Sequence, residues 1–273
     1  DSTSANQANI VNNAGANVTF TDQANGGTGQ ITNNGAVAFS GDASAGQMLL
    51  INNEGATLDF SGNSTADAAA VTNNGQLGFA DSATAGTSSI VNNESGVVVF
   101  SGTSTAGSSF IANSGKTSFE GNSTAGSAEI VNNATGTVAL SGNATLGSAS
   151  VNNGGDVVFS GNASAGSASI VTGPEGRTIF TGNSDGGTAA LEADAGAVVD
   201  FSGVTDGAIS IGSIKGPGTF YLGGVVLSVG GNNLSTTVDG AIVDGGISGG
   251  KGGALTKVGT GTLTLSGANT YTG

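Results

Sequence analysis

The sequence predicts an all-β fold, in which a single chain winds into a parallel β-helix (β-solenoid) with coils of roughly 19–21 residues. Three observations predict it. The stretch "FSGNSTA" at Phe60 recurs with small changes, one large apolar residue returns at nearly constant spacing, and the chain contains 51 Gly but only 2 Pro among 273 residues. Such repeats bury their inner face only by stacking, so each coil must offer the next an almost identical surface.

One large residue marks each repeat, and we call it the landmark: Phe20, Phe39, Phe60, Phe79, Phe100, Phe119, Leu140, Phe159, Phe180, Phe201 and Phe220. The spacing is 19 or 21 residues, mostly in alternation. It alternates because the corner between an Asn-Asn pair and the next landmark has a long form ("NNEGATLDF") and a short form ("NNGQLGF"). We infer a double unit that was duplicated.

Each repeat predicts two short strands. One ends at the landmark, with an apolar residue two positions earlier, as in Val98 and Phe100. The other carries an apolar residue eleven positions after the landmark, as in Ile111. Residues two apart share one face of a strand, and glycine or Ala-Gly pairs mark the bends between strands. No stretch keeps the 3- and 4-residue apolar spacing of a helix, and a β-sandwich would need hairpin turns.

Stacking then predicts continuous ladders through the coils. Phe should lie on Phe inside, and Asn on Asn at a corner, where side-chain amides bond from coil to coil. The outer surface is expected to be polar, without a large apolar patch.

The charge pattern argues against several functions. Net charge is −14, and the only basic residues are Lys116, Arg177, Lys215, Lys251 and Lys257. These dispersed cations form no basic patch, so binding to nucleic acid or to anionic lipid is not expected. The chain has no Cys, hence no disulfide, and no run of 18 apolar residues that would predict a membrane-spanning helix.

The C-terminal stretch "GGALTKVGTGTLTLSGANTYTG" closely resembles the passenger-associated repeat of bacterial autotransporters (type V secretion). The residues that carry the resemblance are Leu255, Lys257, Gly259, Gly261, Thr262, Leu263, Leu265, Gly267, Asn269, Thr270, Tyr271 and Gly273. The earlier repeats resemble passenger repeats more loosely. We therefore expect regular β-helix repeats over residues 1–205, irregular coils of the same β-helix over 206–250, and a passenger-associated repeat coil over 251–273.

The resemblance implies a right-handed coil, exported across the outer membrane of a Gram-negative bacterium through the protein's own C-terminal β-barrel. It also implies that folding starts at the C-terminal end. We interpret the chain as a passenger fragment, with its barrel and signal peptide outside it. The family includes adhesins, proteases, esterases and toxins, so the resemblance alone names no activity.

The residues themselves argue against catalysis and against a cofactor or metal. The chain has no His, so a Ser-His-Asp arrangement is impossible, and "GNSDG" (Gly182 to Gly186) is a repeat corner without a base. Asp22, Asp42, Asp81 and Asp156 occupy differing repeat positions, which argues against a metal site. The acidic group is interpreted as a solvated face and contains Asp185, Glu192, Asp194, Asp200 and Asp206.

What remains is an outer ladder of hydroxyls, five positions after each landmark: Thr65, Thr84, Thr105, Thr124, Thr145 and Ser164. Such a ladder either binds a partner or only provides a polar surface that keeps the protein soluble. The sequence thus favours a non-enzymatic, surface-exposed or secreted structural passenger acting in adhesion or self-association (cell aggregation or biofilm). Its expected partners are a second copy, or host surface glycans or matrix proteins. The alternative is a stalk that displays an enzymatic or toxin domain outside this sequence.

Overall fold

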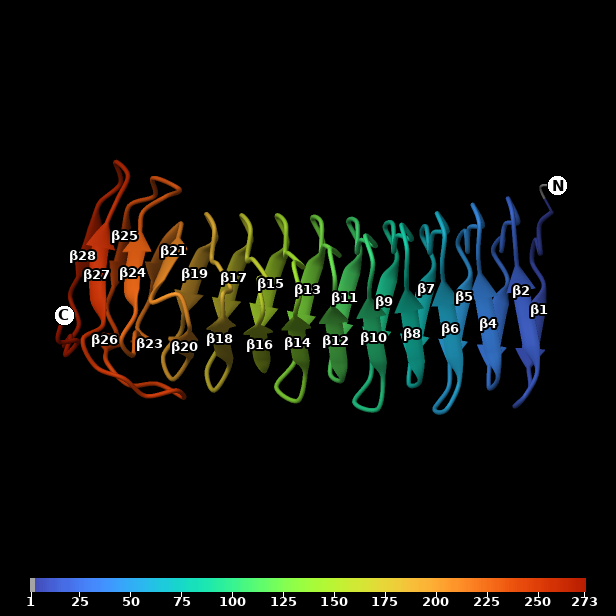
Figure 1. The fold of residues 1–273 in the computed structure, drawn as a ribbon. Helices are drawn as coiled ribbons and strands as arrows, with labels where there is room; N and C mark the ends of the chain where they lie inside the picture. Colours follow the sequence, from blue (N-terminus) through green and yellow to red (C-terminus); the bar gives the residue numbers. More distant parts are fainter. Residues whose placement is uncertain (1–2) are drawn as a thin grey trace. The chain divides into compact units, whose positions relative to one another are not determined.

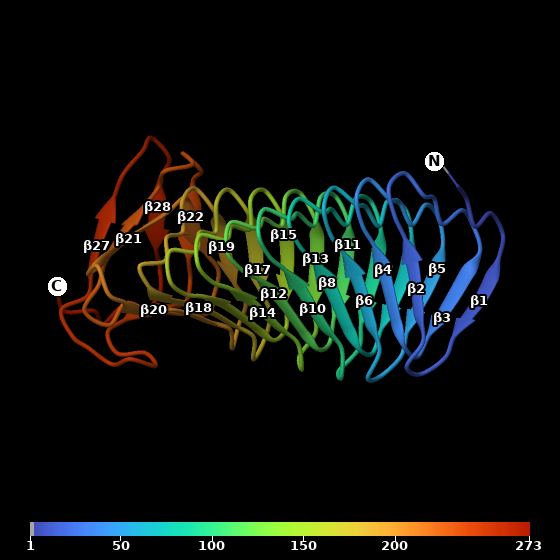
Figure 2. The same cartoon turned by 45° about the vertical axis from the view of Figure 1, so that its right-hand side comes forward.

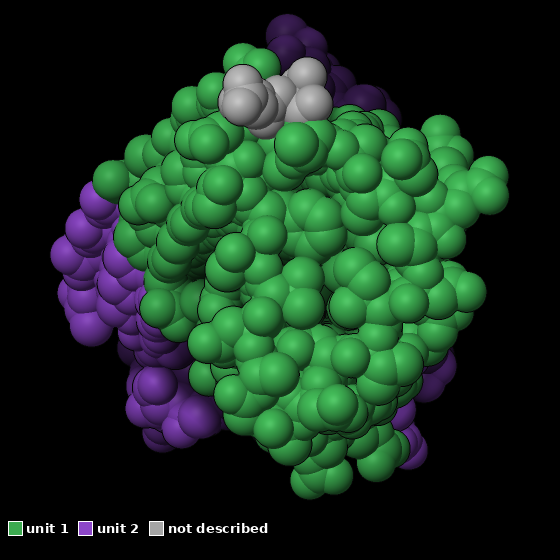
Figure 3. Space-filling model, turned by 90° about the vertical axis from the view of Figure 1, so that its right-hand side faces the viewer, with its two compact units in different colours: residues 1–130 green, residues 131–273 purple. Residues whose placement is uncertain are grey.

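The computed structural model describes residues 3–273 and confirms the predicted fold class. The described chain contains no helix, and its parallel strands stack as a β-solenoid of about 11 turns of ~21 residues (Figure 1). The described residues therefore include no membrane-spanning helix. The chain divides into two compact units, residues 1–130 and 131–273 (Figure 3). The right-handed sense of the coil stays a prediction.

Residues 3–130 form two parallel sheets of four-residue strands (Figure 2). The odd sheet contains β1 (Asn9–Asn12), β3 (Gln30–Asn33), β5 (Leu49–Asn52), β7 (Ala70–Asn73), β9 (Ser89–Asn92) and β11 (Phe110–Asn113). The even sheet contains β2 (Asn17–Phe20), β4 (Ala36–Phe39), β6 (Thr57–Phe60), β8 (Gln76–Phe79), β10 (Val97–Phe100) and β12 (Lys116–Phe119). The boundary between the units falls within β13 (Glu129–Asn132).

The landmarks form the predicted inner ladder. Each strand pairs in register with the equivalent strand of the next coil, so that Phe100 lies between Phe79 and Phe119. From Phe20 to Phe119 the stacked rings have centroids 4.5–4.9 Å apart and planes within 6–9° of parallel. Each buried ring stabilises the fold by roughly 1.5–3 kcal/mol. Stacking like on like therefore builds the core coil by coil.

Besides the two sheets, a third line of parallel backbone pairing runs along the chain, between the end of each even strand and the start of the next odd strand. It consists of isolated parallel bridges formed by Asn25, Ser44, Thr65, Thr84, Thr105 and Thr124. The residues on either side of each bridge, such as Ser104 and Ala106, point into the core and are fully buried. The turns flanking this line of pairing need a positive φ, which glycine adopts without strain; Gly102 has φ 67° and Gly107 has φ 65°.

Residues 131–273 begin with the same two-sheet pattern. The first sheet holds β15 (Ser150–Asn153), β17 (Ser169–Thr172), β19 (Ala190–Ala193) and β22 (Ser213–Lys215). The second holds β14 (Thr137–Leu140), β16 (Asp156–Phe159), β18 (Arg177–Gly182), β20 (Val198–Val204), β23 (Thr219–Tyr221) and β26 (Ala241–Val243). Two further sheets follow, one of β21 (Ala208–Ile211), β24 (Val226–Val229) and β27 (Ala254–Lys257), the other of β25 (Thr236–Val238) and β28 (Leu263–Leu265).

The pattern changes where the sequence repeat loosens. The register between β18 and β20 shifts between Ile179 and Thr181, and β21 then starts a new sheet. This change lies beside the first boundary of the predicted division into residues 1–205, 206–250 and 251–273. The division itself stays a prediction.

One expectation about charge is wrong. The sequence predicts Asp200 on a solvated face, but this residue is only 1% exposed. Its two carboxylate oxygens accept the backbone N–H groups of Ser202 (2.8 Å) and Ile247 (2.7 Å). The segment after β26 folds back onto β20, and it is anchored there by Asp200 and by a bond from the Ser248 N–H to the Ser202 hydroxyl.

The outer surface of residues 3–130 is not polar at every position. Val11, Leu49, Val91 and Phe110 are large, exposed hydrophobic residues, and all four lie on strands of the odd sheet. The sequence pattern concerned inward positions, where every coil is alike. These side chains occupy the outward positions, where neighbouring coils differ.

Candidate functional site

The hydroxyl ladder lies on the outside of the third line of pairing, as predicted, but every hydroxyl in it is used by the fold. In residues 3–130, the side-chain oxygens of Thr65, Thr84, Thr105 and Thr124 accept the backbone N–H two residues further on, at 2.8–3.0 Å. In residues 131–273, Thr145 and Ser164 do the same at 3.0 Å. These bonds close the turn that follows each bridge.

The equivalent positions in other coils show what this turn requires. Asn25 and Asp185 also accept the N–H two residues on, through their side-chain carbonyl or carboxylate oxygens. The shared property is an acceptor, which explains the repetition without any ligand. A hydroxyl that accepts one bond still has its hydrogen to donate, and Ser44 donates it to Asp67 across 3.1 Å. The ladder therefore offers a partner half-buried O–H donors.

The predicted Asn ladder is present and is buried. In residues 3–130 the Nδ2 of each first Asn of a pair donates to the Oδ1 of the next coil's Asn at 2.8 Å, in the order Asn12, Asn33, Asn52, Asn73, Asn92 and Asn113. The same amide groups donate to backbone carbonyls of the corner, as Asn52 does to Gln76. This ladder holds the corner and is not accessible to a partner.

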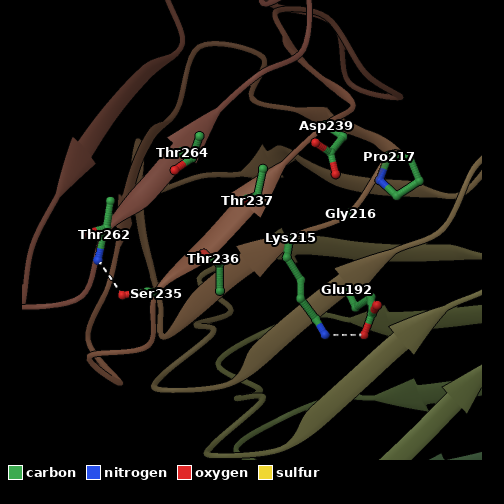
Figure 4. Close-up of a pocket in the computed structure, with 10 residues that line it drawn as sticks. All are labelled: Glu192, Lys215, Gly216, Pro217, Ser235, Thr236, Thr237, Asp239, Thr262 and Thr264. Atoms are coloured by element: carbon green, nitrogen blue, oxygen red, sulfur yellow. Dashed lines mark hydrogen bonds and ion pairs between the residues drawn. The ribbon is translucent and has the colours of Figure 1, made fainter.

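Residues 131–273 contain a groove of about 460 Å³ (Figure 4). It is lined by Glu192, Lys215, Gly216, Pro217, Ser235, Thr236, Thr237, Asp239, Thr262 and Thr264. A second hollow of about 320 Å³ adjoins it and shares Glu192, Lys215, Ser235 and Thr236. We call the two together the hydroxyl groove.

Parallel pairing positions the groups of the hydroxyl groove. Glu192 and Lys215 are register partners on β19 and β22, and Lys215 Nζ lies 2.7 Å from a Glu192 carboxylate oxygen. Thr237 and Thr264 are partners on β25 and β28. The Ser235 hydroxyl accepts the Thr262 N–H at 3.0 Å. The groove thus presents several hydroxyls around one ion pair, groups that bind polyhydroxylated or peptide-like ligands by hydrogen bonds.

Sequence reasoning missed this groove. It treated Glu192 as part of a solvated acidic face and did not connect it with Lys215. The available signal was the repeat itself. Leu191 and Ile214 are register partners that face inward. The next residues, Glu192 and Lys215, must therefore face outward and lie side by side. Opposite charges at those outward positions predict an ion pair.

The residues that carry the family resemblance form the last described coils. Leu255 and Lys257 lie on β27 beside Leu227 and Val229, while Leu263 and Leu265 lie on β28 beside Thr236 and Val238. The Lys257 ammonium donates to the carbonyls of Val258 and Gly259. Asn269 Oδ1 accepts the Ile242 N–H at 2.8 Å, and the Thr270 N–H donates to the Ile242 carbonyl at 3.0 Å. Tyr271 is half-buried.

The glycines of this motif lie against the backbone of the preceding coil. A Cβ on Gly267 would come 1.7 Å from the Gly240 carbonyl oxygen, and one on Gly261 would come 2.2 Å from that of Leu234. Gly259 has φ 68°, and a Cβ there would lie 2.1 Å from the Gly230 carbonyl oxygen. Close stacking therefore explains the glycine spacing of the motif, independently of any role in secretion.

A single carboxylate ties the end of the chain together. Asp244 accepts the Thr272 hydroxyl at 2.6 Å and the backbone N–H groups of Gly252 and Gly253 at 3.3 and 3.0 Å. These bonds, that from Thr272 above all, hold the pKa of Asp244 below its ordinary value. Asp244 therefore links β26 to the segments before β27 and after β28.

The remaining acidic residues of the described chain lie apart or in ion pairs with basic residues. No group of three or more His, Cys, Asp or Glu among residues 3–273 is arranged to hold a metal ion. Asp156 forms a two-bond ion pair with Arg177, whose pKa it raises by hydrogen bonding and by charge. On the outer face of the even sheet, desolvation raises the pKa of Asp59.

Comparison with known proteins adds no constraint: no family model, no curated protein and no solved structure matches the chain.

Proposed function

We propose that the chain is a non-enzymatic structural passenger, displayed on a cell surface or secreted, that acts in adhesion or self-association. Export through the outer membrane of a Gram-negative bacterium, by way of a C-terminal β-barrel, is part of this proposal and rests on the passenger-associated repeat. The role in adhesion rests on one observation: a polar side chain, most often a hydroxyl, recurs at the same outward position, five residues after the landmark, from coil to coil.

Repetition supports adhesion because weak contacts then act together. One exposed hydrogen bond contributes about 0.5–1.5 kcal/mol net, too little to hold two cells. Many such bonds in register along one solenoid, on many copies per cell, give avid contact. The hydroxyl groove favours a second kind of partner for the same function. Its hydroxyls and its Glu192–Lys215 pair suit a host glycan or an extended segment of a matrix protein.

The experiment displays the passenger on cells and measures aggregation. Like-charged copies repel, and salt screens that repulsion over ~8 Å at physiological strength, so aggregation should rise from low salt to about 0.15 M. A chelator should leave it unchanged. Thr105→Asp together with Thr124→Asp should weaken it, if hydroxyl donors of the ladder mediate contact.

A matched control places the same charges where no ladder hydroxyl is lost, at Ser108 and Ser127, which are exposed on the same two coils. Loss of aggregation on chelation would indicate metal bridging instead. Confirmed display without aggregation at any salt, and without binding to glycans or matrix proteins, would favour the stalk that carries another domain.

A further inference from the structure

The outer face of the odd sheet is free of charge from β1 to β11, and exposed Glu129 at the start of β13 is the first charged residue along it. None of the six strands β1, β3, β5, β7, β9 and β11 contains a charged residue. The even sheet differs, because its outward positions include Asp59 and Lys116. Acidic residues stand at the corners beside the odd sheet instead, at Glu54, Asp67 and Glu94. In a chain of net charge −14, this face is a neutral surface with an acidic rim.

The same face carries the exposed hydrophobic side chains. Val11 is 67% exposed, Leu49 and Val91 are each 40% exposed, and Phe110 is 37% exposed. They are the only large hydrophobic residues found exposed among residues 3–130. A set of exposed apolar residues gathered on one face, with a polar rim, is typical of an interaction surface.

Large and small side chains alternate along this face. The third position of each strand gives the ladder Val11, Thr32, Ile51, Thr72, Val91 and Ala112, in which larger and smaller residues take turns from coil to coil. The first position gives Asn9, Gln30, Leu49, Ala70, Ser89 and Phe110. The alternation in the first of these ladders has the period of the double repeat unit.

Over the six strands from β1 to β11, which are part of a longer sheet, the alternating ladder is complementary to its own reverse. When a second copy is laid on this face with its coil order reversed and its strands parallel, Leu49 faces Ala70, Ile51 faces Thr72, and Val91 faces Thr32 of the other copy. Val11 then faces Ala112, and Phe110 faces Asn9. Every large residue meets a smaller one, and the exchange is reciprocal, as a two-fold symmetric interface requires. The strand spacing of ~4.8 Å is the same in both copies, so the match holds along the face.

We propose that this face is a homotypic interface, on which a second copy of the chain packs with its coils in reverse order. A neutral centre suits a partner that is itself acidic, because like charges are kept to the rim, where water and salt screen them. The inference deepens the proposed self-association by naming its surface, and it rests on that function only for its biological role. It adds a second contact surface, on the odd sheet, to the hydroxyl ladder.

The test uses the purified full chain, which contains no cysteine that could cross-link copies. Sedimentation velocity over a wide concentration range should show a monomer–dimer equilibrium at 0.15 M salt. Val91→Glu should weaken dimerisation at least ~10-fold, because it buries a carboxylate in the neutral face. Val99→Glu is the matched control: it makes the same change on β10, at an outward position of the even sheet, and should leave the equilibrium within about twofold.

A second variant keeps the test decisive if V91E fails to fold. Phe110→Ser adds no charge, removes a large side chain from the same face, and should also weaken the dimer. A wild-type chain that stays monomeric, or an equal loss of dimerisation in V91E and V99E, would overturn the proposed interface.

Cells that display the passenger distinguish this interface from the proposed adhesive function. Aggregation that survives V91E and F110S keeps the adhesive function and rejects this surface, whereas a V91E-sensitive dimer in cells that never aggregate keeps the surface and rejects the function.

Discussion

The side-chain amide of Asn52 donates to Asn73 Oδ1 across 2.8 Å, from one coil to the next, and both side chains are fully buried. Asn73 passes the bond on to Asn92 at the same distance. Each amide also donates to a carbonyl at the corner, so its donors and acceptor are satisfied inside the protein. The corner between the two sheets of residues 3–130 is thus held by one continuous chain of amides.

Asn73→Ala should therefore destabilise the fold by roughly 2–4 kcal/mol, because it leaves the Asn92 acceptor buried without its donor and removes two bonds to carbonyls. Chemical denaturation monitored by circular dichroism measures this. The neighbouring Asn74→Ala is the control, since Asn74 only accepts a bond from Asn93 at the half-buried corner. Equal losses for the two variants would contradict the structural role of the inner ladder.

Phe100 and Ser101 test the inward and outward alternation. Phe100 lies fully buried between two rings, with centroids at 4.7 and 4.8 Å. Phe100→Asp buries a charge without a partner and should cost several kcal/mol, about the loss that unfolds a marginal domain. Ser101→Asp, on the next and half-buried position, should cost about 0.5 kcal/mol. Similar melting temperatures for the two variants would be incompatible with the assigned core.

Ser104 and Thr105 should respond in opposite directions to the same substitution. The Ser104 hydroxyl is buried and has no hydrogen-bond partner, and alanine occupies the equivalent positions at Ala83 and Ala144. Ser104→Ala should raise the free energy of unfolding by up to about 1 kcal/mol. Thr105→Ala removes the acceptor for the Gly107 N–H and should lower it by roughly 1 kcal/mol. A stability loss in S104A would show that its hydroxyl has a partner.

The bonds to Asp244 should depend on pH. Since they depress the pKa of Asp244 in the folded state, they stabilise the C-terminal coils above the ordinary Asp pKa of 3.8. That contribution is lost as pH falls through the depressed folded value. Hydrogen exchange at Gly252, Gly253 and Thr272 should be faster in Asp244→Asn than in the wild type at neutral pH, and the difference should vanish in strong acid. A difference that is unchanged in acid would exclude the carboxylate as the cause.

The repeat made the interior predictable. Inward residues must match their neighbours in the stack, so residues such as Val98, Phe100 and Ile111 can be identified as inward-facing because the same residue types recur at the same repeat positions. The strands, their register and the Asn ladder of the structure agree with that expectation. The long and short corners also appear in the structure, since β1 pairs with β3 at an offset of 21 residues and β3 with β5 at 19.

The outer surface was not predictable in the same way, because stacking does not force outward residues to match. Leu49 and Phe110 are separated by the small residues Ala70 and Ser89, and only the structure brings them together on one neutral face. Asp200 is another case. Its burial depends on a segment that returns from 47 residues further along the chain, and no local pattern signals that contact.

The uniform pairing within residues 3–130 also has a mechanical consequence. Every coil is joined to the next by the same short strands, the same stacked ring and the same amide bond, so no coil is much stronger than its neighbour. A chain pulled by its ends would then yield by peeling, one coil at a time, at a nearly constant force. Each step would release about 70 Å of chain, at ~3.3–3.6 Å per residue. Stretched between two surfaces, such a tether would absorb work in many small increments before breaking.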